Sequence, residues 1–376
     1  RDYGRSWTSI VNGLPASEPS GSFARVIRED PKRPGLLFAG TESSVHVSFN
    51  DGDMWQSLTL DLPNTPVRDL VIKDNDLLLA THGRGLWVLD DISLLRQLST
   101  EIAGEPTHLF APGLATRVRR SVNYSTPLPP EIPHALNPPD GISLDYWLGL
   151  EPSGPIALDI LDAAGALLRH YTSEPELPVA EAARPPHPNF WVAVPQPLPT
   201  TAGAHRVNWD LRHNPPPAFS HTFEINANPG LTPASPIGPL VLPGVYTVRL
   251  TVDGKSLTQR VTVRNDPRSR STPAALAAQL ALQLRIVAAL RAAGEGYQQV
   301  KGQGGAADSI PAAATKTFRS VGNTLAAQLT AQDNADLAPT AAMAAAFAGA
   351  CRDLVAVRAA WQRTLRVALL TLPPCR

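Results

Sequence analysis

The first 98 residues follow the hydrophobic pattern of β-structure. Short apolar segments alternate with turns that contain Gly, Asp or Pro, which is typical of strands rather than helices. The expected strands cover residues 23–27, 36–40, 45–49, 55–58, 67–72, 77–81 and 86–89. Their order predicts two successive antiparallel sheets.

The next section, residues 99–265, also alternates, and we expect a β-sandwich there. The expected elements are a strand at 142–148 and hairpins at 155–170 and 243–263. The second hairpin turns at Asp253-Gly254, a pair that favours a two-residue connection. Residues 174–200 are crowded with proline and predict an insertion without a core of its own.

The last section, residues 266–376, changes to the helical period. Leucines recur three and four positions apart after Thr272-Pro273, a good N-cap and first-turn pair. Gly294 and Gly296 predict the end of this helix. Further helices are expected at 311–332 and from 339 to the prolines at 373–374. Three Ala-rich helices predict a small helical bundle.

One short motif, S-x-[DN]-x-G-x-x-W, occurs twice, with its tryptophans 48 residues apart. Its chemistry is that of a hairpin turn, because an Asx side chain accepts bonds from turn amides, Gly takes the positive-φ corner and Trp packs under the next strand. We expect a structural role for Asp2, Gly4, Trp7, Ser48, Asn50, Gly52 and Trp55. The first copy is cut by the start of the sequence, so we expect the chain to be the C-terminal part of a larger protein.

The two motifs are Asp-boxes, and with the segment at 81–91, which contains His82-Gly83-Arg84-Gly85, they resemble bacterial sortilin-like, BNR-repeat β-propeller proteins. Such proteins are often labelled glycosyl hydrolases. The resemblance implies the last blades of a propeller at 1–98, an immunoglobulin-like sandwich at 99–265 and a helical bundle at 266–376. It also implies export, to a secreted, periplasmic or cell-surface location, and a glycan or peptide ligand held by the complete ring.

Composition excludes some classes of function. The chain has 33 basic and 33 acidic residues, so its balance does not suggest nucleic-acid binding. No apolar run reaches the roughly 18 residues of a membrane span. A disulfide between Cys351 and Cys375 requires an oxidising compartment, and the helix predicted between them favours free thiols.

His82 and Arg84 are the candidate ligand-binding residues. Gly83 and Gly85 allow a tight path beside them, and near a propeller axis an Arg and a His bind a carboxylate or sugar hydroxyls. The alternative, which we favour, is that the glycines shape the connection between two strands while Arg84 pairs with Asp90 or Asp91.

Catalysis has less support in the sequence. The acids of the first 98 residues form no recognisable pair of the kind that glycoside hydrolysis needs, so the catalytic residues are unknown. His205 and His213 lack the close spacing of a metal site, and no cofactor fingerprint is present.

Three hypotheses follow. The first is a non-catalytic structural and binding portion of an exported propeller protein. The second is part of an exo-acting glycoside hydrolase whose catalytic residues lie mostly upstream. The third assigns partner binding to the helical tail from Arg268 onward, which carries 12 basic and 5 acidic residues.

Overall fold

The computed structural model describes residues 3–15, 23–119, 132, 138–174, 193–221, 235–312, 314–366 and 369. The chain divides into two compact units. The first contains residues 1–112, 145–150 and 202–206, and the second contains residues 113–144, 151–201 and 207–376. The second unit therefore holds both β-strands and the helical tail.

Two antiparallel sheets build most of the first unit, as the alternating pattern predicts. The first sheet is a meander of β1 (Ala24–Glu29), β2 (Leu37–Thr41), β3 (Val45–Ser48) and β4 (Gln56–Ser57). The second is formed by β5 (Val67–Lys73), β6 (Asp76–Thr81) and β7 (Leu86–Leu89). One core lies between them, where Val26 and Phe38 of the first sheet meet Leu70 and Leu79 of the second. After β7 come α1 (Ser93–Gln97), α2 (Thr100–Ala103) and β8 (Thr107–Leu109).

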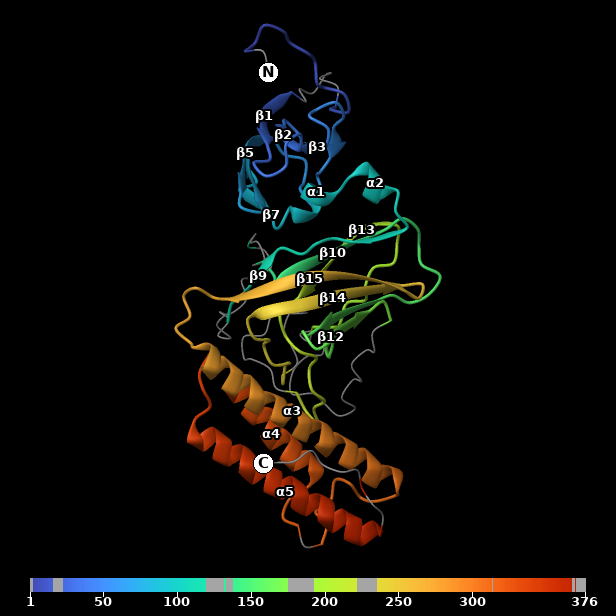
Figure 1. Cartoon of the computed structure of the whole chain (residues 1–376), viewed down its shortest axis with the longest axis vertical. Coiled ribbons are helices and arrows are strands. Elements are labelled where there is room, and N and C mark those ends of the chain that lie inside the picture. Colours follow the sequence, from blue (N-terminus) through green and yellow to red (C-terminus); the bar gives the residue numbers. More distant parts are fainter. Residues whose placement is uncertain are drawn as a thin grey trace. The chain divides into compact units, whose positions relative to one another are not determined.

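A five-stranded mixed sheet forms the β-part of the second unit. Its order is β12 (Leu167–Thr172), β11 (Ala157–Leu161), β14 (Gly244–Val252), β15 (Lys255–Asn265) and β9 (Leu114–Arg117). The strands β14 and β15 are the long yellow-to-orange pair in Figure 1. Asp253 and Gly254 join them with φ angles of 47° and 75°, the positive pair that a tight hairpin turn requires. β9 pairs with β15 in parallel, a strand that the sequence did not reveal.

Two further strands, β10 (Ile142–Leu148) and β13 (Gly203–Trp209), run through both units. They belong to a three-stranded sheet in the order β13-β10-β8. At the end of β13, Trp209 is fully buried and meets the ring of Tyr246 edge to face, with ring centres 5.6 Å apart. Gly141 lies beside it, and a Cβ on Gly141 would come within 1.9 Å of the Trp209 carbonyl oxygen.

The helices α3 (Pro273–Gly302), α4 (Phe318–Gln332) and α5 (Ala341–Leu365) lie alongside one another in the orange and red part of Figure 1. Thr272 caps α3 by accepting from Ala275 N. The prediction that Gly294 and Gly296 end this helix is wrong, because α3 continues through both. A Cβ on Gly296 would lie 2.6 Å from the ring of Phe318, so this glycine allows a close approach of α4.

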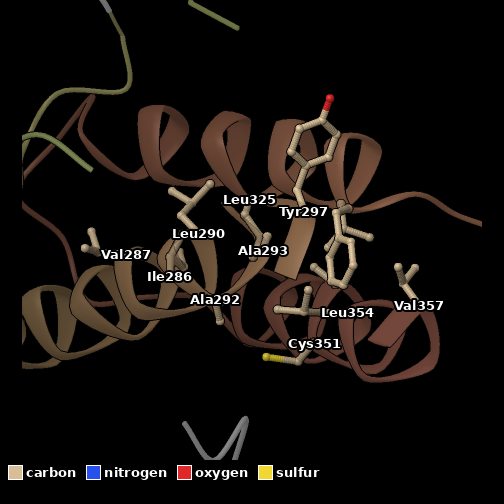
Figure 2. Packing of buried hydrophobic residues seen from close by; sticks show 14 of the residues in the cluster. Ile286, Val287, Leu290, Ala292, Ala293, Tyr297, Leu325, Cys351, Leu354 and Val357 are labelled. Carbon is tan, nitrogen blue, oxygen red and sulfur yellow. The ribbon is translucent and has the colours of Figure 1, made fainter. Parts of the chain in front are cut away.

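Aliphatic and aromatic side chains from all three helices form the bundle core. Figure 2 shows Ile286, Leu290 and Ala293 of α3 facing Leu325 of α4 and Leu354 of α5. By length and composition α3 is the one helix among the described residues that could cross a membrane, which is weak evidence and leaves the expectation of no membrane span only weakly supported. Its apolar stripe, however, is buried in this core, as in the core helix of a globular domain.

Cys351 belongs to the same core, with 2% of its surface exposed (Figure 2). It is disulfide-bonded, so the expectation of a free thiol is wrong here. Cys375, the only other cysteine of the chain, lies outside the described residues. Secreted and periplasmic proteins are the usual setting for a structural disulfide.

Within the second unit, an arginine and aspartate network connects the sheet to the helices. Arg117 at the end of β9 donates to Asp336 at 2.6 Å, and Arg119 donates to the other oxygen of the same carboxylate at 2.8 Å. Arg119 and Arg212 also pair with Asp333, at 2.7 and 2.9 Å. Burial acts to raise the pKa of Asp336, but the two guanidinium groups outweigh it and hold that pKa below its ordinary value.

Candidate functional site

The candidate site is the loop from His82 to Gly85, which connects β6 to β7 in the first unit. Thr81 closes the loop, because its amide and hydroxyl both donate to the Gly85 carbonyl, at 3.1 and 2.7 Å. Gly83 and Gly85 have φ angles of 86° and 72°, a region that favours glycine. No atom lies within 4 Å of a Cβ built on either, so backbone conformation rather than crowding calls for glycine here.

His82 and Arg84 are both exposed. Within the described part of the chain, neither side chain has a hydrogen bond or an ion pair, and Arg84 contributes only its carbonyl, which accepts from Trp87 Nε1 at 3.0 Å. The expected pairing of Arg84 with Asp90 or Asp91 is absent. Neither side chain would have to give up a hydrogen bond or an ion pair with a described residue in order to bind a ligand.

A third basic residue, Arg68, lies on β5 beside this loop, and sequence reasoning missed it. Val67 pairs with Thr81 and Asp69 with Ala80, so Arg68 occupies an irregular position in the ladder. Its side chain is exposed and makes no hydrogen bond or ion pair with a described residue. No local signal in the sequence sets Arg68 apart, because its place beside the loop follows from the pairing of β5 with β6.

The basic residues of this region influence one neighbouring acid. Glu42 accepts a hydrogen bond from Arg25 Nε. That bond is the main reason why the pKa of Glu42 is lowered, and the charges of Arg68 and His82 contribute in the same direction. The loop region is thus locally basic, which suits an anionic or hydroxyl-rich ligand.

Arg206 of β13 binds the backbone of Asp90 and Asp91, the two acidic residues that follow β7. Its guanidinium donates to the carbonyls of Asp90 and Asp91, at 2.7 and 2.6 Å, and to both carboxylate oxygens of Asp145, at 2.8 and 2.9 Å. Burial raises the pKa of Asp90, with Asp76 adding to the effect. Each oxygen of the Asp145 carboxylate accepts one hydrogen bond from Arg206, so this acid links β10 to β13.

The second Asp-box forms the turn between β3 and β4. Ser48 Oγ accepts from Gly52 N at 3.0 Å, and Asn50 Oδ1 accepts from Met54 N at 3.0 Å. Gly52 has a φ of 91°. Trp55 is 2% exposed and donates to the Ile10 carbonyl at 2.7 Å. The side chains of Ser48 and Asn50 and the backbone of Gly52 therefore form the turn, and Trp55 is buried next to it.

The first Asp-box differs. Asp2 lies outside the described residues, and Gly4 has a φ of 81°. Trp7 is 91% exposed, whereas the motif predicts a packed indole. No described residue covers the indole of Trp7 in the way that the indole of Trp55 is covered.

Metal ligation has no candidate in the described residues, where no three His, Cys, Asp or Glu side chains come together. His205 instead lies beside the ring of Tyr146, with ring centres 5.2 Å apart.

No protein-family model and no curated protein matches the chain. Among solved structures it is similar to the extracellular domain of a B. thetaiotaomicron protein described as a hybrid two-component system, with 12% identity and a TM-score of 0.16. A second structure, described as the extracellular domain of a one-component system of the same organism, gives 11% identity and a TM-score of 0.17. In both cases the likeness covers 66% of this chain, and the chain spans about a third (32%) of the other. Likenesses at this level carry no argument about function.

Proposed function

We propose that the chain is a non-catalytic structural and binding portion of an exported, propeller-type protein. In this proposal the sheets β1–β4 and β5–β7 are two successive blades. His82, Arg84 and Arg68 contact a glycan or peptide that carries carboxylates. Export is supported by the disulfide at Cys351.

The observation that carries the architectural part is the outer face of the second sheet. Val71 pairs with Leu78, and Leu78 pairs with Val88, so the three side chains lie in one row across β5, β6 and β7. They are 51%, 37% and 51% exposed. The opposite face of the same sheet is covered by the first sheet. A propeller blade needs cover on both faces, and an uncovered apolar row supports packing of a further blade here.

The binding part rests on the loop. His82 and Arg84 lie on a loop whose backbone Thr81 fixes, and their side chains make no hydrogen bond or ion pair with a described residue, so they can donate hydrogen bonds to an anionic ligand. We expect the whole protein to bind an acidic oligosaccharide or an acidic peptide, and His82→Ala and Arg84→Ala to weaken that binding about tenfold or more each. Fluorescence anisotropy with a labelled uronate oligomer and with a labelled Glu-rich peptide measures the affinity of the unchanged protein and of each variant.

The matched control is Lys73→Ala, at the other end of β5, where the lysine makes only an exposed pair with Asp74. This variant should bind as the unchanged protein does. Equal loss in all three variants would show non-specific charge attraction and contradict a loop site. Hydrolysis of the oligosaccharide by the unchanged protein would contradict the non-catalytic assignment.

A further inference from the structure

One cavity among the described residues is lined entirely by residues of the second unit, whereas the loop described above belongs to the first unit. It is a cleft of about 390 Å³ between α3 and the region around β12. Leu168, His213 and Pro239 line one side, and Val287, Arg291 and Glu295 of α3 line the other. Its volume falls in the lower part of the range of small-molecule sites, roughly 300–1,000 Å³.

The base of the cleft is apolar and closely packed. Val287 and Ala292 line it and also belong to the bundle core, where both are at least nine-tenths buried (Figure 2). Leu168 and Pro239 face them across the cleft. The backbone around Pro239 is closely packed, because a Cβ on Gly238 would come within 1.9 Å of the His213 carbonyl oxygen. A ligand with an aliphatic part would find a preformed surface here.

Two opposite charges stand at the edge of this surface. Arg291 and Glu295 are four residues apart on one face of α3, a spacing at which such side chains commonly pair. Both are exposed, and neither makes an ion pair or a hydrogen bond with any described residue. The cleft therefore offers one free cation and one free anion within a helical turn of each other.

The facing wall supplies neutral polar groups. The His213 backbone is fixed by a bond from its amide to the Pro239 carbonyl, at 2.9 Å, and its imidazole has no described partner. Burial lowers the pKa of His213; Asp162 opposes this and Arg291 adds to it. The ring is therefore neutral near pH 7 and can donate or accept. Asn214 accepts from His170 N at 3.0 Å, which leaves its amide NH₂ group to donate.

We propose that this cleft binds a small zwitterion with an aliphatic side chain, namely an apolar α-amino acid or a short apolar peptide. Its carboxylate pairs with Arg291, its ammonium group with Glu295, and its side chain packs on Leu168 and Val287. The cleft presents one positive side chain, one negative side chain and neutral polar groups. This set is complementary to a zwitterion, which carries one negative and one positive group and has no net charge. The assignment is independent of the ligand proposed for the loop at His82.

Isothermal titration calorimetry of the whole protein tests the assignment with four related compounds. Leucine and leucyl-leucine carry both charges, N-acetylleucine keeps only the carboxylate, and leucinamide keeps only the ammonium group. We expect leucine or leucyl-leucine to bind at least tenfold more tightly than either singly charged analogue. The better of the two identifies whether a free amino acid or a peptide is the preferred ligand.

Two variants assign each end of the ligand. Arg291→Gln should weaken leucine but leave leucinamide unchanged, and Glu295→Gln should weaken leucine but leave N-acetylleucine unchanged. Arg260→Gln, at an exposed position of β15 outside the cleft, is the matched control and should bind like the unchanged protein. Absence of heat with all four compounds, or equal affinity for leucine and both analogues, would overturn the proposal.

Discussion

Asp336→Asn should lower the free energy of unfolding of the second unit by about 3 kcal/mol or more. Arg117 and Arg119 both pair with this carboxylate, and their side chains are only 3% and 12% exposed. Removal of one charge from a buried ion pair typically costs about 3–5 kcal/mol, because the partner stays buried without compensation. An amide of the same shape cannot restore the lost charge.

The effect should depend on pH in a defined direction. The folded-state pKa of Asp336 is lowered, so its stabilisation is fully present above the unfolded-state pKa, about 3.9. It is lost as the pH falls through the folded-state pKa. The unchanged protein and the variant should therefore differ most near neutrality and converge in strong acid.

Urea unfolding followed by far-UV circular dichroism measures this change, since the three long helices all belong to the second unit. Asp308→Asn is the matched control, because Asp308 pairs with Arg319 at the surface, where the two side chains are 62% and 44% exposed. Exposed pairs contribute little, so the control should unfold close to the unchanged protein. If the free energies of unfolding of the unchanged protein and of Asp336→Asn differ by the same amount at neutral and at acid pH, the role of charge is contradicted.

Gly141→Ala should destabilise the same unit by about 3 kcal/mol, through two added costs. Gly141 has a φ of 96°, where a side chain is strained by roughly 1–2 kcal/mol. In addition, the new Cβ would meet the Trp209 carbonyl oxygen at 1.9 Å, and overpacking typically costs a further 1–3 kcal/mol. The displaced backbone carries Trp209, the fully buried indole at the end of β13.

Gly165→Ala separates these two costs. Gly165 has a similar φ of 82°, but nothing lies within 4 Å of a Cβ built there. It should lose only the backbone contribution, about 1 kcal/mol. Equal losses in the two variants, measured by the same urea titration, would show that the close approach to Trp209 is unimportant.

Local sequence signals were sufficient for most strands. The strand at 142–148 has the predicted bounds, and Asp253-Gly254 marks the hairpin between β14 and β15. In both, the residues that determine the structure are neighbours in the chain. β9 was missed because it pairs in parallel with a strand some 148 residues later. Such a pairing has no turn between the two strands, so no local sequence pattern predicts it.

Glycine was the least reliable signal. Gly294 and Gly296 predicted a helix end, yet α3 passes through them, because the absence of a side chain at Gly296 makes room for Phe318. Tertiary packing of this kind cannot be derived from a local pattern. The same limit applies to the candidate site: the sequence indicated His82 and Arg84, but Arg68 lies beside them only through the pairing of β5 with β6.

The discontinuity of the first unit has a consequence for the order of folding during translation. β8 pairs with residues 146–148 of β10, and Arg206 then fastens β10 to the carbonyls of Asp90 and Asp91. Because a ribosome releases the chain from its N-terminus, β1–β7 can pair with each other early, while β8 stays unpaired until β10 emerges. Arg206 is released later still, after a large part of the second unit's sheet. The first unit therefore cannot finish folding before part of the second unit has been synthesised. Its last strands, from residues 145–150 and 202–206, are translated after residues 113–144 of the second unit.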